Sequence, residues 1–423
     1  MLHKQALSQE QKRYVESYAS GCPTVVALIR RRAALSPAAV AVVDKTSALS
    51  YEELDRQSDA LAIRLRQNGV GAGKYVGIML PRTKEYIVAI LATLKAGGTY
   101  VPLDAACPRI RLNTIVTQSS MSCLIIRGGK IPTWDAQPVQ SVIDMEDMSY
   151  ASPGYACAPD YSEEVGAACL MFTSGTTGEP KGVIISHRYI KSLALYGSRL
   201  FQLTERDRVM LHPSFGVIAS FGNIYPALIS GSSVHIISDD LRHDIMALRR
   251  YIVHAGISGG VLYTAIGSQL LDSRLTSMRW MMMGGETVLL YGIKYPQTVD
   301  GFVVADPVSI VKAPKSWSKG LTGDPKKQLP NVLSTGLNSD PRVVHRIQND
   351  PANLHHLTVG ILQNEIKGAY SLREHLTGFK DPLLFLQGQK DGLIDYHDSL
   401  EAYAMIASND KELQVRQYND CLH

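Results

Sequence analysis

Small hydroxyl residues, glycines and one lysine follow an apolar run, and together they are suited to holding phosphate. The stretch 173–181 reads Thr-Ser-Gly-Thr-Thr-Gly-Glu-Pro-Lys. Gly175 and Gly178 let backbone N–H groups approach an anion without obstruction by Cβ atoms. Lys181 adds a compact positive charge for phosphate oxygens. The hydroxyl side chains that would add hydrogen-bond donors are those of Thr173, Ser174, Thr176 and Thr177. The pattern predicts a phosphate-binding loop.

The same stretch also has the composition of a flexible Gly/Ser/Thr linker, so the flanking residues matter. Apolar runs at 170–172 and 183–185 enclose it, and they predict a strand on each side. A linker requires neither these strands nor the lysine. The spacing Gly-x-x-x-x-Gly-Lys-Ser/Thr of the Walker loop is absent. We therefore favour a phosphate loop of another type.

Composition limits the classes of protein to which the chain can belong. Its 423 residues, 45% of them hydrophobic, suffice for two or three ordinary domains. The net charge of +4 comes without a dominant basic block interleaved with aromatics, so we expect no nucleic-acid partner. No apolar run reaches the ~18 residues of a membrane span. Six scattered cysteines without a Cys-x-x-Cys pair predict a reducing, cytoplasmic location.

Alternating apolar segments predict the elements that position the loop. Strand and helix alternate from residue 25 onward, which is typical of an α/β fold with a parallel sheet. Ser50 with Glu53 has the spacing of a capping box, and Gly97 would end a helix. The first 20 residues predict a helical lead-in, and 129–165 predict a loop. The expected helices are 25–35, one beginning after Ser50, 84–96 and 109–118, and the expected strands are 39–44, 76–80, 100–103 and 123–126.

Taken with other blocks in the same order, the loop resembles the signature of adenylate-forming (AMP-binding) enzymes. These include acyl-CoA synthetases, luciferases and the adenylation domains of nonribosomal peptide synthetases. The resemblance covers residues ~20–286. The further blocks that resemble this family are 49–54, 94–104, His187, the pocket wall at 215–231, and 278–286 with Gly284, Gly285 and Glu286 beside the adenine.

The resemblance implies a reaction and its participants. A substrate carboxylate attacks the α-phosphorus of ATP bound with Mg²⁺, and pyrophosphate leaves. Lys181 and the loop donors would stabilise the charge on the leaving group, and His187 is the second candidate catalytic residue. The acyl-adenylate would pass to the thiol of a phosphopantetheine carrier protein or of CoA. The residues implied for nucleotide binding are Thr173, Ser174, Gly175, Thr176, Thr177, Gly178, Lys181, Gly284, Gly285 and Glu286.

The wall of the acid pocket departs from one version of the family pattern. Domains that activate α-amino acids place Asp after the pocket Phe, where its carboxylate pairs with the substrate ammonium. This chain has Phe215-Gly216 instead. A buried ammonium without a partner is costly. The substitution therefore favours a hydroxy, aryl or fatty acid as the substrate.

After Glu286 the adenine, ribose and second-lysine motifs of the family do not follow. Residues ~283–423 instead resemble the late part of a monoacylglycerol-lipase-like α/β-hydrolase, with strands at 302–306 and 383–388, Asp391 as the triad acid and His423 as the triad histidine. Met282 stands where the nucleophilic serine belongs. A thioether cannot form an acyl-enzyme. Ordinary loop positions for Asp391 and His423 are the alternative to a preserved acid–base pair.

The sequence thus predicts a chimera of two α/β parts. These are a lead-in (1–20), an incomplete adenylate-forming domain (21–286) and a partial α/β-hydrolase fold (287–423). The predicted function is ATP-dependent activation of a carboxylic acid, reduced to nucleotide binding if the missing motifs are essential. The alternatives are a lipase-type serine hydrolase that lacks its nucleophile and a non-catalytic nucleotide-binding module.

Overall fold

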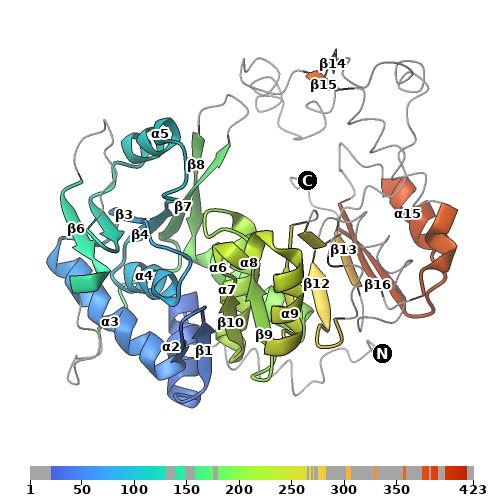
Figure 1. Cartoon of the computed structure of the whole chain (residues 1–423), viewed down its shortest axis with the longest axis horizontal. Helices are drawn as coiled ribbons and strands as arrows, with labels where there is room; N and C mark the ends of the chain where they lie inside the picture. The colour runs from blue at the N-terminus through green and yellow to red at the C-terminus, as the bar shows by residue number, and fades with distance from the viewer. Residues whose placement is uncertain are drawn as a thin grey trace. The chain divides into compact units, whose positions relative to one another are not determined.

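The computed structural model divides the chain into two compact units. The larger unit comprises Ala6–Ser174 and Glu179–Val261, and the smaller comprises Leu262–His423 with Met1–Gln5 and Gly175–Gly178 (Figure 1). The residues that the structure describes are 21–129, 139–147, 158–174, 180–263, 266–267, 270, 275–282, 302–305, 328–330, 356–358, 374–380, 383–388 and 396–416.

The first sheet of the larger unit has at its edge the two strands that flank the predicted phosphate loop. Its strand order is β6-β5-β3-β4-β7-β8. All neighbours run parallel except β7 and β8, which form an antiparallel pair. The bounds are β3 Tyr75–Ile78, β4 Thr99–Pro102, β5 Cys123–Ile126, β6 Ser141–Asp144, β7 Ala167–Ser174 and β8 Pro180–Ser186.

The second sheet of this unit has the order β11-β9-β10-β1-β2. Its pairs are parallel except β1 with β2. Because sequential strands are parallel, their carboxyl ends share one edge of each sheet. The bounds are β1 Val40–Val43, β2 Ala48–Ser50, β9 Arg208–Leu211, β10 Ser233–Ile236 and β11 Gly259–Val261.

Buried helices join the two sheets. Helix α4 packs on β3 and β4, and α7 packs on β9 and β10. Tyr100 of β4 and Tyr225 of α7 share a buried hydrogen bond of 2.9 Å between their hydroxyls, so α7 also reaches the first sheet. The bounds are α2 Val25–Leu35, α3 Tyr51–Gln67, α4 Lys84–Lys95, α5 Arg109–Ser119, α6 His187–Leu200, α7 Phe221–Ser230, α8 Asp239–His243 and α9 Ile245–Ala255.

Local signals set the ends of these helices. Ser50 accepts from the Glu53 backbone while the Glu53 carboxylate accepts from the Ser50 backbone, which confirms the predicted capping box. Gly97 follows α4 with φ +79°, a left-handed conformation that favours glycine. The helix therefore ends where the sequence predicts.

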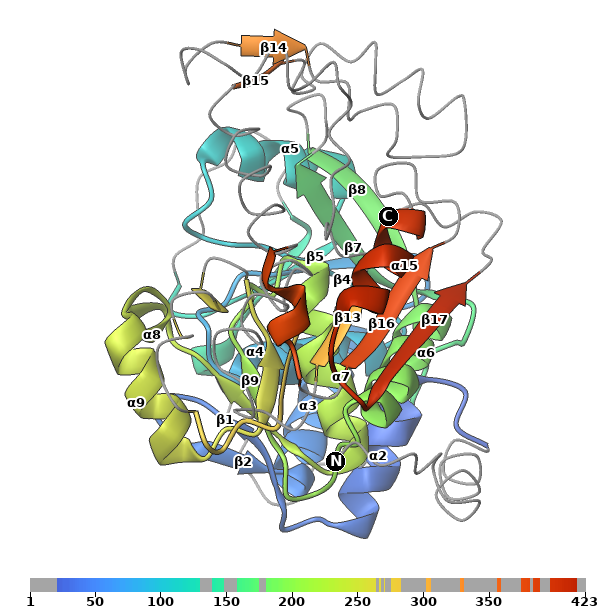
Figure 2. The ribbon, with the colours of Figure 1, turned by 90° about the vertical axis from the view of Figure 1, so that its right-hand side faces the viewer.

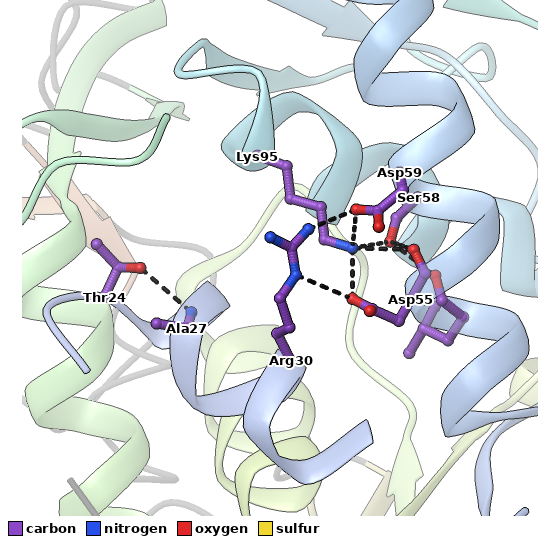
Figure 3. A network of polar contacts seen from close by, with 8 residues as sticks. Thr24, Ala27, Arg30, Asp55, Ser58, Asp59 and Lys95 are labelled. Carbon is purple, nitrogen blue, oxygen red and sulfur yellow. Dashed lines mark hydrogen bonds and ion pairs between the residues drawn. The ribbon is translucent and has the colours of Figure 1, made fainter. Parts of the chain in front are cut away.

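A network of buried charges joins α2, α3 and α4 (Figure 3). The side chain of Lys95 is 2% exposed, and its Nζ lies 2.6 Å from Asp55 and 2.8 Å from Asp59. It also donates to Ser58 at 2.7 Å. Arg30 of α2 contacts both carboxylates from the other side. Two cations thus face two anions, which compensates the loss of hydration.

The smaller unit contains short strands and a helix. Strands β13, β16 and β17 form a parallel sheet in that order, and β14 pairs with β15. The strands predicted at 302–306 and 383–388 are confirmed as β13 and β16. The bounds are β12 Trp280–Met282, β13 Phe302–Ala305, β14 Gln328–Pro330, β15 His356–Thr358, β16 Leu383–Gly388, β17 Lys411–Arg416 and α15 Tyr396–Met405.

One prediction of local structure was wrong. Strand β6 lies inside 129–165, which the sequence predicted to be a loop. Its four residues pair with β5 along their whole length, and Ile143 is buried. So short a segment forms a strand only because it pairs with the neighbouring strand β5. The predicted lead-in at 1–20 lies outside the described residues. Across the described residues, no helix is both long and apolar enough to cross a bilayer.

Candidate functional site

Strands β7 and β8 flank the phosphate motif as the sequence predicts, and the structure shows that they pair as an antiparallel hairpin. Thr173 lies opposite Lys181 in the ladder, and Ser174 lies opposite Pro180. The structure describes the backbone of these residues but not their side chains, and Gly175, Thr176, Thr177 and Gly178 lie outside the described residues. The predicted strand–loop–strand arrangement is thus confirmed at its two strands.

A pocket of 1010 Å³ lies at the carboxyl ends of the parallel strands of the larger unit. Its walls come from the segments that follow β3, β4, β9 and β10, and from Phe172 of β7. Open α/β sheets bind ligands at this edge because the loops after their strands converge there. The position is therefore that of a ligand site, and Phe172 directly precedes Thr173 of the phosphate motif.

Arg82 joins the two sheets at the base of this pocket. Its guanidinium donates to the carbonyls of Leu211, Pro213 and Ile237 at 2.8–2.9 Å and to that of His212 at 3.2 Å. The side chain is 9% exposed. These carbonyls follow or end β9 and β10, while Arg82 follows β3. A single planar cation therefore fixes the segment that leads to Phe215.

Phe215 and Gly216, the predicted acid-pocket residues, both line the pocket. The Phe215 ring stacks on Tyr86 of α4 with centroids 3.9 Å apart and an interplanar angle of 2°. A Cβ added to Gly216 would meet only the Ser214 hydroxyl, at 3.8 Å. Neither backbone conformation nor crowding requires glycine here. Its effect is to leave this one position of the wall without a charged side chain.

The pocket is lined by more basic than acidic side chains. The basic side chains are those of Arg82, Arg111, Arg127 and Arg242, and the acidic ones are those of Asp104 and Asp239. Asp239 lies 3.2 Å from Arg242 and 3.8 Å from Arg82. Asp104 accepts a hydrogen bond from the Ala106 backbone. The pKa of the half-buried Cys107 thiol is raised above its ordinary value, because the effect of burial exceeds the opposing effect of the neighbouring Arg111 charge.

His187 is buried at the start of α6 and is not among the residues that line the pocket. Burial lowers the pKa of its imidazole to about 4, against an opposing charge effect of Asp160. The ring is therefore neutral at pH 7. Its Nδ1 has no hydrogen-bond partner within the described part of the chain. A catalytic role for His187 stays a prediction.

Several predicted residues lie outside the described part of the chain: Gly284, Gly285, Glu286, Asp391 and His423. Met282, at the expected nucleophile position, is in β12, and its carbonyl accepts from the Leu262 backbone at 2.9 Å. Conversely, sequence reasoning missed Arg82, Tyr86 and Arg111. Arg82 lies in the segment after a predicted parallel strand, and Tyr86 and Arg111 lie in the first turns of the helices that come next. Their place at the carboxyl ends of the strands was the signal that would have indicated them.

Comparison with protein families assigns the two parts of the chain separately. The profile of the family described as AMP-binding enzyme matches residues 29–289. The profile described as serine aminopeptidase, S33, matches residues 282–423. The second match confirms an α/β-hydrolase resemblance in the C-terminal region.

Relatives and solved structures agree for the first part. Tyrocidine synthase 1 of Brevibacillus parabrevis is 34% identical over 299 residues, 67% of this chain and 27% of that protein. Malpinin synthetase of Mortierella alpina is 33% identical over 256 residues, 60% of this chain and 3% of that protein. The chain therefore spans about a quarter or less of these relatives.

Two solved structures show the same fold. The nonribosomal peptide synthetase FmoA3 in its AMPPNP-bound form has a TM-score of 0.57 at 23% identity, over 64% of this chain and 30% of that one. The N-terminal subdomain of Klebsiella oxytoca NpsA in complex with 3-hydroxybenzoyl-AMSN has a TM-score of 0.54 at 24% identity, over 67% and 66%.

Proposed function

Because the chain belongs to the AMP-binding enzyme family, we propose that it activates a carboxylic acid as an acyl-adenylate, with ATP as co-substrate. The observation that carries this proposal is the β7–β8 hairpin, which sets Thr173 opposite Lys181 across the phosphate motif. The pocket at the carboxyl ends of the strands supports it, because that edge provides room for a ligand.

Each part of the site has a role in this reaction. The acid carboxylate attacks the α-phosphorus, the bond to the β-phosphate oxygen breaks, and pyrophosphate leaves with the bonding electrons. Lys181 and the donors of residues 173–178 stabilise the negative charge on the leaving group. Phe215 and Gly216 are assigned to the acid, and Gly284, Gly285 and Glu286 are assigned to the adenine by the family motif alone. His187 is assigned no step.

The substrate class follows from the uncharged wall at Gly216. A substrate ammonium there would need a carboxylate, and the two that line the pocket are engaged elsewhere, Asp239 with arginines and Asp104 with a backbone amide. The residue beside Gly216 in the pocket wall is the apolar Phe215. We assign the pocket to a hydroxy, aryl or fatty acid rather than to an α-amino acid.

The metal and the acyl acceptor come from outside the chain. No residue is assigned to Mg²⁺, which would arrive on the phosphates of ATP. A thiol of a phosphopantetheine carrier protein or of CoA would accept the acyl group. Residues 21–286 form the activating domain and 287–423 the hydrolase-like part.

Pyrophosphate exchange into ATP tests the proposal. The panel comprises benzoate, hydroxybenzoates, a medium-chain fatty acid and several α-amino acids. We expect exchange with an acid that lacks the ammonium, and its loss by about 100-fold in Lys181→Ala. Lys191→Ala, on helix α6, is the matched control. Absence of exchange with every acid would contradict the proposal.

Gly216→Asp tests the substrate class separately. A Cβ fits at this position without a clash, so the variant should fold. It should weaken exchange with an acid that lacks an ammonium group about tenfold, because the new carboxylate repels the substrate carboxylate, and it should favour an acid with an ammonium group, which the new carboxylate attracts. An unchanged order of preference would contradict the assigned class.

Two other outcomes point to the alternative functions. ATP binding without exchange, abolished by Lys181→Ala, would indicate a non-catalytic nucleotide-binding module, the form expected if the motifs missing after Glu286 are essential. The hydrolase profile over residues 282–423 favours a second candidate, a serine hydrolase. Labelling of any serine by a fluorophosphonate would support it. We expect none, because Met282 occupies the nucleophile position.

A further inference from the structure

One guanidinium in the pocket is not balanced by a carboxylate. Arg111, on helix α5, lines the pocket. Within the described residues it donates a hydrogen bond of 3.4 Å to the Phe172 carbonyl, and the Cys107 thiol lies close enough for its pKa to be affected by the Arg111 charge. No Asp or Glu of the described chain pairs with it. A guanidinium has five donors, so most of its capacity is available to a ligand.

The other pocket arginines are already engaged. Arg82 is occupied by four backbone carbonyls. Arg242 pairs with Asp239 at 3.2 Å. Arg127 lies 3.4 Å from Glu85 and 3.6 Å from Glu146. Arg111 therefore differs from the other pocket arginines in its partners. It is the pocket arginine that would gain the most hydrogen bonds and charge compensation from a bound anion.

The position of Arg111 relates it to the phosphate hairpin. Helix α5 packs against β8, and both views show it beside the β7–β8 pair (Figures 1 and 2). The carbonyl that Arg111 contacts belongs to Phe172, the residue before Thr173 in β7. The guanidinium thus lies on the pocket wall where the strand leads into the phosphate motif.

We propose that Arg111 binds an oxyanion in this pocket, namely the phosphate oxygens of the pyrophosphate part of ATP. Arginine presents two parallel N–H donors that match a phosphate, and a charged partner makes such bonds stronger than neutral ones. The assignment of the anion to ATP rests on the proposed function, whereas the presence of an oxyanion site does not.

Cys107 provides a local reporter for the site. Its thiol is half-buried, lines the same pocket and lies beside Arg111. The other cysteines of the described chain, Cys22, Cys123 and Cys169, are buried. An anion held by Arg111 would obstruct the approach of an alkylating reagent to Cys107. Peptide mass spectrometry distinguishes this thiol from the others.

The experiment measures iodoacetamide alkylation of Cys107 in the full chain against sodium pyrophosphate alone. We expect pyrophosphate to slow the alkylation. In Arg111→Gln the pyrophosphate concentration for half-protection should rise about tenfold, the loss of a charge-assisted hydrogen bond. Arg111→Lys, which keeps the charge, should retain part of the protection. Each variant is compared with itself without pyrophosphate, since Arg111 also affects thiol reactivity.

Arg109→Gln is the matched control. It removes the same charge from the same helix, and Arg109 is exposed and is not among the pocket-lining residues. Its half-protection concentration should stay at the wild-type value. Circular dichroism and the unfolding midpoint establish that each variant is folded. Equal protection in Arg111→Gln and wild type, or no protection in wild type, overturns the proposal.

Two further measurements, protection by benzoate and pyrophosphate exchange, identify the oxyanion and test the proposed function independently of the site. If benzoate protects Cys107 through Arg111 and pyrophosphate does not, the anion is a carboxylate and the pyrophosphate assignment fails. If pyrophosphate protects but no acid supports exchange, the site stands and the proposed function fails. If exchange occurs and its KM for pyrophosphate is unchanged in Arg111→Gln, the function stands and the site fails.

Discussion

Lys95 and Arg111 are both cations at helices of the larger unit, but their surroundings differ. Lys95 is 2% exposed and contacts two carboxylates and a hydroxyl. Arg111 lines an open pocket and has no carboxylate partner in the described chain. A buried cation must have its partners within the fold, because dehydration is otherwise too costly. A cation at a pocket wall stays hydrated and keeps its capacity for a ligand. The two side chains carry the same charge, but the partners of Lys95 give it a structural role, whereas Arg111 keeps donors for a ligand.

The largest effect is expected when the buried network loses its central cation. Lys95→Met leaves Asp55 and Asp59 facing Arg30 alone, so the free energy of unfolding should fall by about 3–5 kcal/mol. Urea denaturation measures it. Lys45→Met is the matched control, since its pair with Asp240 is exposed on both sides and solvent screening leaves it little effect on stability. Arg111→Gln should also cost less than about 1 kcal/mol. If Lys95→Met and Arg111→Gln lowered the free energy of unfolding equally, the two cations would not differ in structural role.

A smaller loss is expected at Arg82, which lines the pocket but has structural partners. Arg82→Gln frees up to four carbonyls that a shorter side chain cannot reach, which should lower stability by about 2–3 kcal/mol. Hydrogen exchange of the amides at 212–217 should increase, because Arg82 holds that segment. Arg242→Gln removes a pocket arginine with one exposed partner and should leave those amides unchanged. Unaltered exchange in Arg82→Gln would contradict its role.

The smallest effect is expected at a buried anion, and it depends on pH. The side chain of Asp44 is 1% exposed. Its burial raises the pKa, but hydrogen bonds from the backbone of Lys84, from the Thr46 hydroxyl and from the Ser47 and Thr46 amides outweigh this and hold it at about 2, against 3.8. A depressed carboxylate pKa stabilises the folded state above the unfolded value, and this stabilisation is lost as the pH falls through about 2.

Asp44→Asn tests this pH dependence. At pH 7 the variant should be less stable than the wild type by about 2 kcal/mol. The difference should narrow as the pH falls from 4 toward 2, because the wild-type carboxylate becomes protonated. Chemical denaturation at pH 7, 4 and 3 measures it. A difference that is independent of pH would mean that the hydrogen-bond geometry, and not the charge of Asp44, supports the turn.

Local structure could be predicted wherever a few neighbouring residues decide it. The capping box of Ser50 and Glu53, the helix end at Gly97 and the strands around the phosphate motif depend on contacts within one or two turns of chain. A family motif assigns Phe215 and Gly216 to the substrate pocket, and both line the pocket at the strand ends; that this pocket takes the acid stays a prediction.

The sequence by itself therefore determined the α/β alternation, the helix ends and the two strands that flank the phosphate motif, because short-range sterics and hydrogen bonds between neighbouring residues decide them. Tertiary structure alone decided strand β6, the bonds from Arg82 to carbonyls 129–155 residues away, and the meeting of Arg111 with Phe172, 61 residues on. These depend on which strands are neighbours in the sheets. Strand order is set by the packing of the whole unit, and no local pattern encodes it.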